Sequence, residues 1–145
     1  MSAPVSEAER RAIEADCARL INHYVNLNDA QDWPAVAALY TEDAVFRRPS
    51  GGDPIEGREA ILASFLARPP RVQRHVIANV VVEVEDSDHA CSFCAILLYQ
   101  GDPVADGLPA LSANSPLIGW FRDRLVRTPE GWRFAERVGG LDFRP

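Results

Sequence analysis

The chain has 145 residues, of which 47% are hydrophobic and 25% charged, and its formal net charge at pH 7 is -6. These values are ordinary for one globular domain, and a chain of this length can bury enough surface to fold without disulfides or metals. The acidic balance argues against nucleic-acid binding, because phosphate neutralisation requires clustered Lys and Arg side chains. No apolar run approaches the roughly 18 residues of a membrane span, and no signal peptide is visible, so we expect a cytoplasmic protein with no membrane partner.

Three helices are predicted in the first half of the chain. The first covers residues 6–29, where a capping box precedes apolar residues that recur at three- and four-residue spacing. A short second helix has Asp32 as its N-cap and Pro34 in its first turn. A short strand follows at 44–46, and a third helix at 57–68 is ended by two prolines.

The apolar period then changes to two, which is typical of strands. The extended runs cover about residues 72–85, 90–100, 116–127 and 131–139. Tight turns join most of these runs, and this predicts an antiparallel meander. Helices followed by a meander indicate an α+β fold, and we expect a single domain over residues 1–145, with residues 1–6 as a flexible tail.

The first long strand is predicted to be apolar on both faces. Strict alternation puts His75, Ile77, Asn79 and Val81 on one face, and the even-numbered residues from 76 to 84 on the other. One face can pack on the helices, whereas the second needs another cover. A second copy of the chain is the simplest cover, so we expect self-association through the outer face of the sheet.

Three polar residues suggest chemistry in a pocket between the helices and the sheet. Asp29 ends the first helix and His75 opens the first long strand. An Asp beside a His holds the imidazole in one tautomer and stabilises its protonated form, so that the His can act as a general base. Arg137, on the last strand, could stabilise developing negative charge. Each of the three also has a purely structural interpretation: a satisfied strand histidine, a helix-end or turn aspartate, and an ion-paired arginine.

No cofactor or metal site is predicted. The three histidines are scattered without supporting carboxylates, and the chain has neither a Gly-rich phosphate loop nor a serine nucleophile elbow. Cys91 and Cys94 form a C-x-x-C, but they lie in an extended run where residues three apart point to opposite faces. We interpret them as packed thiols.

Four segments together resemble the SnoaL-like branch of the NTF2-like superfamily, over roughly residues 8–140. These segments are YVNLNDAQDW, AALYTEDAVF, RHVIANVVVEVED and DRLVRTPEGWRFAERV. The branch groups with scytalone dehydratase, a hexachlorocyclohexane dehydrochlorinase and the small β subunits of ring-hydroxylating dioxygenases. The resemblance implies a cone-shaped α+β barrel, with N-terminal helices packed in a strongly curved, mostly antiparallel sheet around an apolar cavity, and assembly as a homodimer or trimer.

The resemblance also implies site residues. The dehydratase and dehydrochlorinase members use an Asp–His dyad whose positions are matched here by Asp29 and His75, with Asn79 completing an H-x-x-x-N pattern. Arg137 stands five residues after a tryptophan, as does a cavity arginine of the dehydrochlorinase. The chain departs at Tyr24, where the dehydrochlorinase has a lysine, so chloride elimination is not supported. It also lacks the second histidine of the fungal dehydratase.

We therefore predict a cofactor-independent lyase, isomerase or cyclase of polyketide or aromatic metabolism, in which Asp29, His75 and Arg137 act on a hydrophobic cyclic or aromatic small molecule. The residues expected to bind that substrate are Tyr24, Trp33, Tyr40, Phe46, Asn79, Trp120 and Phe121. The alternative is a non-catalytic ligand-binding protein or a structural β-type subunit of a ring-hydroxylating dioxygenase.

Overall fold

The computed structural model describes residues 4–145, with helices first and a long meander afterwards, as predicted. The elements are α1 (Glu7–Asp29), α2 (Trp33–Ala37), β1 (Tyr40–Arg47), β2 (Ile55–Glu56), α3 (Arg58–Leu66), β3 (Val72–Val84), β4 (His89–Gly101), β5 (Leu117–Thr128) and β6 (Gly131–Leu141). Of the predicted tail, residues 1–3 lie outside the described residues, and Ser6 caps α1 by accepting a hydrogen bond from the Glu9 amide at 3.1 Å.

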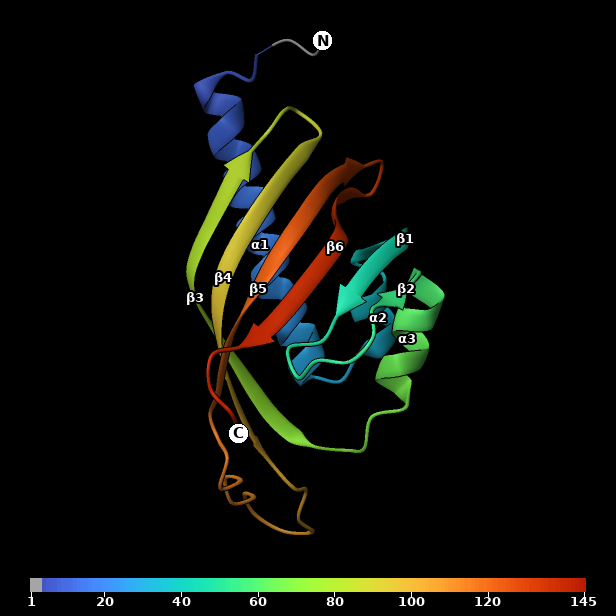
Figure 1. The fold of residues 1–145 in the computed structure, drawn as a ribbon, viewed down its shortest axis with the longest axis vertical. Coiled ribbons are helices and arrows are strands. Elements are labelled where there is room, and N and C mark those ends of the chain that lie inside the picture. The colour runs from blue at the N-terminus through green and yellow to red at the C-terminus, as the bar shows by residue number, and fades with distance from the viewer. Residues whose placement is uncertain (1–3) are drawn as a thin grey trace.

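The strands form one six-stranded sheet in the order β2-β1-β6-β5-β4-β3 (Figure 1). The pair β1–β6 is parallel and every other pair is antiparallel. The α+β prediction with a strongly curved sheet is confirmed, but the sheet stays open, because its two edge strands β2 and β3 do not pair with each other. The edge strand β2 has only two residues.

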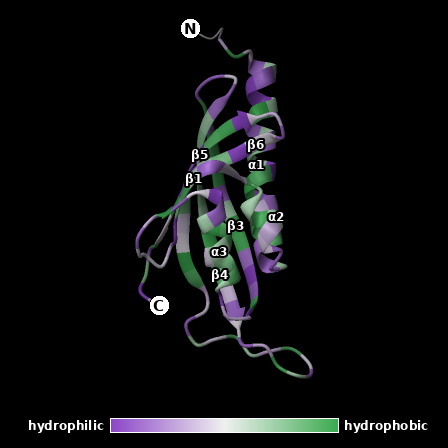
Figure 2. Cartoon of the chain, turned by 90° about the vertical axis from the view of Figure 1, so that its right-hand side faces the viewer, coloured by the Kyte–Doolittle hydropathy of each residue, from purple (hydrophilic) through white to green (hydrophobic). Residues whose placement is uncertain are grey.

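The helices cover one face of the sheet. α1 runs along the sheet and is coloured with both hydrophobic and hydrophilic residues (Figures 1 and 2). Its buried residues recur at three- and four-residue spacing: Ile13, Cys17, Leu20, Ile21, Tyr24, Val25 and Asn28. The short helices α2 and α3 pack together beside β1, where the rings of Trp33 and Phe65 stack at 5.2 Å. The space between the end of α1, these helices and the sheet holds the site described below.

A bulge in β3 changes which side chains face the helices. The register to β4 shifts between Ala78 and Val81, and Asn79 has a φ of 55° in the left-handed region. Such an extra residue reverses the alternation of the strand. Ile77 packs on the core as predicted, but after the bulge Val80 faces the core and Asn79 is exposed. The predicted face assignment is therefore correct up to Ile77 and wrong beyond it.

β6 contains a second bulge. Arg124 pairs with Glu136 while Leu125 pairs with Phe134, so one residue of β6 is unpaired. Trp132 and Arg137, five residues apart, would face opposite sides of a regular strand. The bulge instead puts both side chains inside, where both are buried.

Position 79 offers a test of the β3 bulge. Asn79→Val should lower the free energy of unfolding by about 1–3 kcal/mol, because a β-branched residue is strained at positive φ, whereas Asn79→Gly should be close to neutral. Urea denaturation measures both effects. The neighbouring exposed substitution Ala78→Val is the control and should stay within about 0.5 kcal/mol of wild type. Equal stability of Asn79→Val and Ala78→Val would contradict the bulge.

Candidate active site

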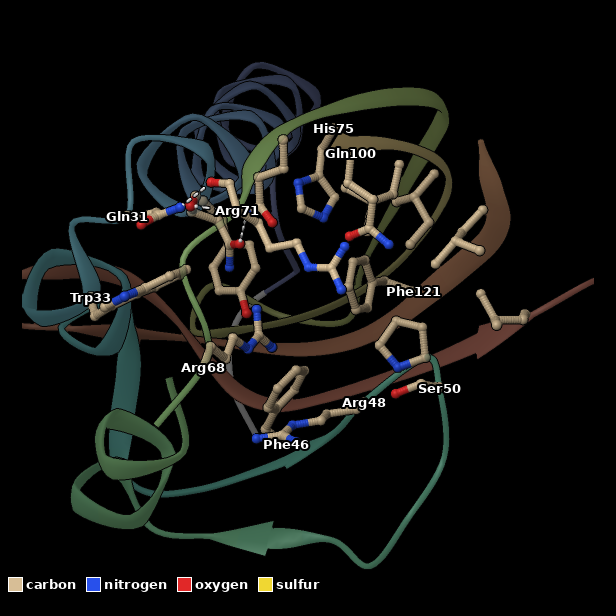
Figure 3. A pocket seen from close by; sticks show the side chains of 18 of the residues that line it. Gln31, Trp33, Phe46, Arg48, Ser50, Arg68, Arg71, His75, Gln100 and Phe121 are labelled. Atoms are coloured by element: carbon tan, nitrogen blue, oxygen red, sulfur yellow. Dashed lines mark hydrogen bonds between the residues drawn. The ribbon is translucent and has the colours of Figure 1, made fainter. Parts of the chain in front are cut away.

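A pocket of about 310 Å³ lies between the end of α1, the α2 and α3 helices and the inner face of the sheet (Figure 3). This volume is at the lower end of the range for small-molecule sites. Apolar side chains from several elements line the cavity: Trp33, Phe46, Ile96, Leu98, Leu117, Phe121 and Leu141. Polar side chains from α1, β3 and β4 complete the lining. The cavity thus offers both apolar surface and many polar groups to a small-molecule ligand.

Asp29 and His75 meet at the wall of this pocket. The Asp29 side chain is 4% exposed and the His75 side chain 11%. Asp29 Oδ1 lies 2.6 Å from His75 Nδ1, and Asp29 Oδ2 accepts the backbone N–H of His75 at 2.8 Å. When Nδ1–H donates to the carboxylate, Nε2 is the nitrogen left to accept a proton. The predicted proximity of these two residues therefore has the geometry of an oriented base.

Amide side chains tie the end of α1 to β3 around the dyad. Gln73 Nε2 donates to Asn28 Oδ1 at 2.9 Å and to the Asn28 carbonyl at 3.1 Å. Gln31 donates to the carbonyl of Arg71. Since Asn28 and Gln73 adjoin Asp29 and His75 along their own elements, these bonds fix the helix end against the strand that carries the histidine. Their effect is to hold the dyad in one geometry.

Two tyrosines form a polar floor. The hydroxyl groups of Tyr24 and Tyr40 lie 2.7 Å apart, and Tyr24 lines the pocket while Tyr40 is completely buried behind it. Burial raises the pKa of both phenols, that of Tyr40 the more, so both remain protonated at neutral pH. Because two hydroxyls share one hydrogen bond, Tyr40 can donate to Tyr24 and leave the Tyr24 proton for a ligand.

Arg137 lies beneath the pocket and is not part of its wall. Its guanidinium is fully buried, with Nε 2.8 Å from Asp123 Oδ1 and Nη2 3.2 Å from Oδ2. It also stacks within 4.4 Å of the ring centroids of Tyr24, Phe121 and Phe134. Burial raises the pKa of the Asp123 carboxyl, and Arg137 acts against that shift. Arg137 thus supports two pocket residues from behind.

The structure brings only some of the predicted residues together. Five of the predicted residues line the pocket: Tyr24, Trp33, Phe46, His75 and Phe121. Asp29 lies directly behind His75. The other predicted residues lie elsewhere: Tyr40 and Arg137 beneath the wall, Asn79 at the bulge, and Trp120 on the outer face of the sheet. Trp120 is excluded because neighbours along a strand point to opposite faces and Phe121 faces inward.

Asn28, at the end of the first helix, lines the pocket as expected, whereas sequence reasoning missed three arginines and three glutamines of the lining. These are Arg48, Arg68, Arg71, Gln31, Gln73 and Gln100. Gln73 had a usable signal, since it stands two residues before His75 and therefore shares its strand face. The arginines had none, because they lie in loops or at a helix end and only the tertiary fold assembles them.

Other features of the chain do not add to this site. Within residues 4–145, no group of three or more His, Cys, Asp or Glu side chains is arranged to hold a metal ion. The three cysteines are free, with Cys94 buried and Cys91 partly exposed. None of the helices in the described part of the chain is long and apolar enough to cross a membrane.

Helices packed against a strongly curved, mostly antiparallel sheet, with a cavity between them, define the NTF2-like class of proteins. Residues 9–138 match the family model of the SnoaL-like domain, and the chain belongs to that family. A search among curated proteins gave no match to the chain.

Solved structures share the fold. A candidate scytalone dehydratase from Novosphingobium aromaticivorans has a TM-score of 0.80 at 16% identity, over 95% of this chain and 89% of its own. An NTF2-like protein with a cystatin-like fold from the same species has a TM-score of 0.72 at 25% identity, over 95% of this chain and 88% of its own. A Catenulispora acidiphila protein in complex with S-DNPA has a TM-score of 0.73 at 26% identity, over 91% of this chain and 95% of its own.

Removing Asp123 from the buried Asp123–Arg137 ion pair should cost more stability than removing Arg137. Asp123→Ala leaves a buried guanidinium that cannot lose its charge, so the free energy of unfolding should fall by about 3–5 kcal/mol. Arg137→Met should cost less at low pH, because Asp123 can bind a proton. Since burial raises the folded-state pKa of Asp123, the stability of this variant should be greatest below about pH 4 and decrease as the pH rises.

Chemical denaturation of both variants over a series of pH values measures this asymmetry. Arg124→Met, on the exposed face of the same strand as Asp123, is the matched control and should change stability by less than about 0.5 kcal/mol. A cost for Asp123→Ala no larger than that of the control would show that the pair is not a stabilising contact.

Proposed function

We propose that the protein is a cofactor-independent enzyme that begins its reaction by removing a proton from a hydrophobic cyclic or aromatic small molecule. The observation that carries this proposal is the 2.6 Å contact of Asp29 with His75 at the wall of the pocket. The S-DNPA complex of the Catenulispora acidiphila protein supports a small-molecule occupant in this fold. The nature of the lining supports an apolar ring as the bulk of that molecule.

In the proposed first step, His75 Nε2 takes a proton from a carbon next to a carbonyl group. The C–H bond breaks, its electron pair moves toward the carbonyl oxygen, and the imidazole becomes an imidazolium. Asp29 accepts the Nδ1–H throughout, so its charge balances the new cation at short range in a nearly buried setting. The carboxylate also holds the histidine backbone, which keeps the ring aimed while the proton moves.

The negative charge that develops on the substrate oxygen needs a donor. Tyr24 lines the pocket, and in this proposal its hydroxyl donates to that oxygen while it accepts from Tyr40. Return of the proton from His75 to another carbon completes an isomerisation, whereas its transfer to a β-hydroxyl releases water and completes a dehydration. Ring closure is the third outcome of the same start: the enolate carbon attacks a second carbonyl carbon of the same molecule, the C=O π electrons move to its oxygen, and that oxygen takes the proton from His75.

We also propose that the chain self-associates as a homodimer or trimer through the outer face of the sheet. Val81 and Phe93 pair across β3 and β4 and are 54% and 37% exposed, and Val76 nearby is 42% exposed. The Arg122 guanidinium stacks over Trp120 on the same face, 5.0 Å from its ring centroid. An apolar surface with an aromatic and an arginine is typical of the centre of a protein interface.

The dyad can be tested without knowing the natural substrate. Wild-type protein should catalyse exchange of carbon-bound hydrogen with solvent deuterium on members of a panel of cyclic and aromatic ketones, enones and hydroxy-ketones. His75→Ala should lower the exchange rate by about 10²–10⁴-fold, because the general base is lost. Asp29→Asn should lower it by a comparable factor, because an amide has only one acceptor oxygen for the two N–H groups that Asp29 accepts and cannot hold the ring in the same tautomer. NMR or mass spectrometry measures the exchange.

The chain provides a matched control for this test. His89 and Asp86 form a second pair, with Nδ1 2.9 Å from Oδ1, on the exposed β3–β4 hairpin. His89→Ala and Asp86→Asn should therefore retain the wild-type rate. Full exchange by His75→Ala on a turned-over compound would refute the base, and ligands that bind in the pocket without exchange or turnover would favour the non-catalytic binding role.

Self-association has its own test. The double variant Val81→Glu with Phe93→Glu should shift the mass in solution toward that of the 16.0 kDa monomer, because each copy would bring two carboxylates into the interface. Val104→Glu, a change at a 52% exposed valine in the β4–β5 loop, should leave the mass unchanged. Light scattering coupled to size-exclusion chromatography measures both. An unchanged oligomer in the double variant would place the interface elsewhere.

A further inference from the structure

The lining of the pocket contains arginines but, among residues 4–145, no acidic residue. Arg48, Arg68 and Arg71 line it, and none of its lining residues within the described chain is an Asp or Glu. This is a local departure from composition, because the chain as a whole has a net charge of -6. The three arginines line one cavity and come from different segments of the chain (Figure 3). A set of converging cations in an apolar cleft attracts an anionic ligand.

Arg68 is held in place by rings instead of a carboxylate. Its guanidinium lies 4.5 Å from the ring centroid of Phe65 and 5.6 Å from that of Trp33. Burial lowers its pKa, and the like charge of Arg48 acts in the same direction. No Asp or Glu of the described residues 4–145 forms a salt bridge with either arginine. Arg48 and Arg68 thus line the pocket as two like charges without an acidic partner among these residues, and a bound anion would be attracted to both.

The hydrogen-bonding capacity of these arginines is also incomplete. Arg48 Nη2 donates to the Ser64 carbonyl at 3.3 Å, but its buried Nε has no partner. Arg71 Nη1 lies 3.5 Å from Asp102 Oδ1, in a pair whose carboxylate is 85% exposed and therefore contributes little. Neither Arg48 nor Arg71 is therefore neutralised by a buried carboxylate of the described chain.

We infer that the ligand of this pocket is an organic anion, an apolar ring system bearing a carboxylate that Arg48 and Arg68 bind. The planar fork of a guanidinium matches the two oxygens of a carboxylate, and the ring then lies against Phe46 and Phe121 on the way to His75. This assignment names the substrate class of the proposed enzyme and rests on that function for its catalytic meaning. The binding itself does not require His75 to act as a base.

A matched pair of probes tests the charge directly. We expect 2-naphthoate to bind wild-type protein at least about tenfold more tightly than its neutral analogue 2-naphthamide, with a preference that shrinks at high ionic strength. Arg68→Gln and Arg48→Gln should each weaken naphthoate binding about tenfold and leave naphthamide binding unchanged. Arg68→Lys keeps the charge but loses the planar fork of the guanidinium, so its affinity for naphthoate should lie between those of wild type and Arg68→Gln. Isothermal titration calorimetry measures all these affinities.

Two controls separate the possible failures. Arg11→Gln removes a 72% exposed arginine of α1 that does not line the pocket, and this variant should bind both probes as wild type does. His75→Ala should retain the preference for naphthoate even where it abolishes proton exchange. Equal affinity of wild-type protein for the two probes, or an unchanged preference in folded Arg68→Gln and Arg48→Gln, would overturn the anion site. Loss of exchange in His75→Ala together with equal probe affinities would leave the proposed enzyme intact and remove only this inference.

Discussion

The junction between the end of α1 and the start of β3 is the contact on which the site depends. One carboxylate, that of Asp29, accepts both the backbone N–H and the ring Nδ1 of His75, 46 residues later in the chain. The strand position and the ring orientation are therefore set by the same group. Because the carboxylate is almost fully buried, losing one of its hydrogen bonds would leave a charge without solvent to replace it. The Asn28–Gln73 bonds add a second tie beside the first.

The bulges in β3 and β6 explain how one strand can direct side chains both to the core and to the pocket or the space beneath it. Before Asn79, β3 turns His75 toward the cavity, and after it the same strand turns Val80 toward the core under α1. In β6 the extra residue lets Trp132 and Arg137 share the inner face. A strand with strict alternation could not direct both side chains of either pair to the inner face. The local breaks in pairing are thus part of what shapes the site.

Features that depend on local signals could be predicted from the sequence, whereas features that depend on the pairing of distant segments could not. α1 was predictable because its cap and its apolar spacing are local signals, and the Asp29–His75 pair followed from a family resemblance. The side on which Asn79 lies was not predictable from alternation, because a bulge depends on pairing with β4. Asparagine is nevertheless among the residues that best tolerate the left-handed region, so its presence within a run of valines was a usable signal.

The same side-chain type has two different roles here, and burial decides between them. Arg137 resembles a cavity arginine by its spacing from Trp132, yet its charge is paired with Asp123 and enclosed by aromatic rings. Its Nη1 has no hydrogen-bond partner among the described residues, but the side chain is fully buried beneath the wall and does not line the pocket. Arg48 and Arg68 lack such a carboxylate and line the cavity itself. This contrast supports assigning the cationic role in the proposed chemistry to the pocket arginines, with Arg137 holding Tyr24 in position beneath them.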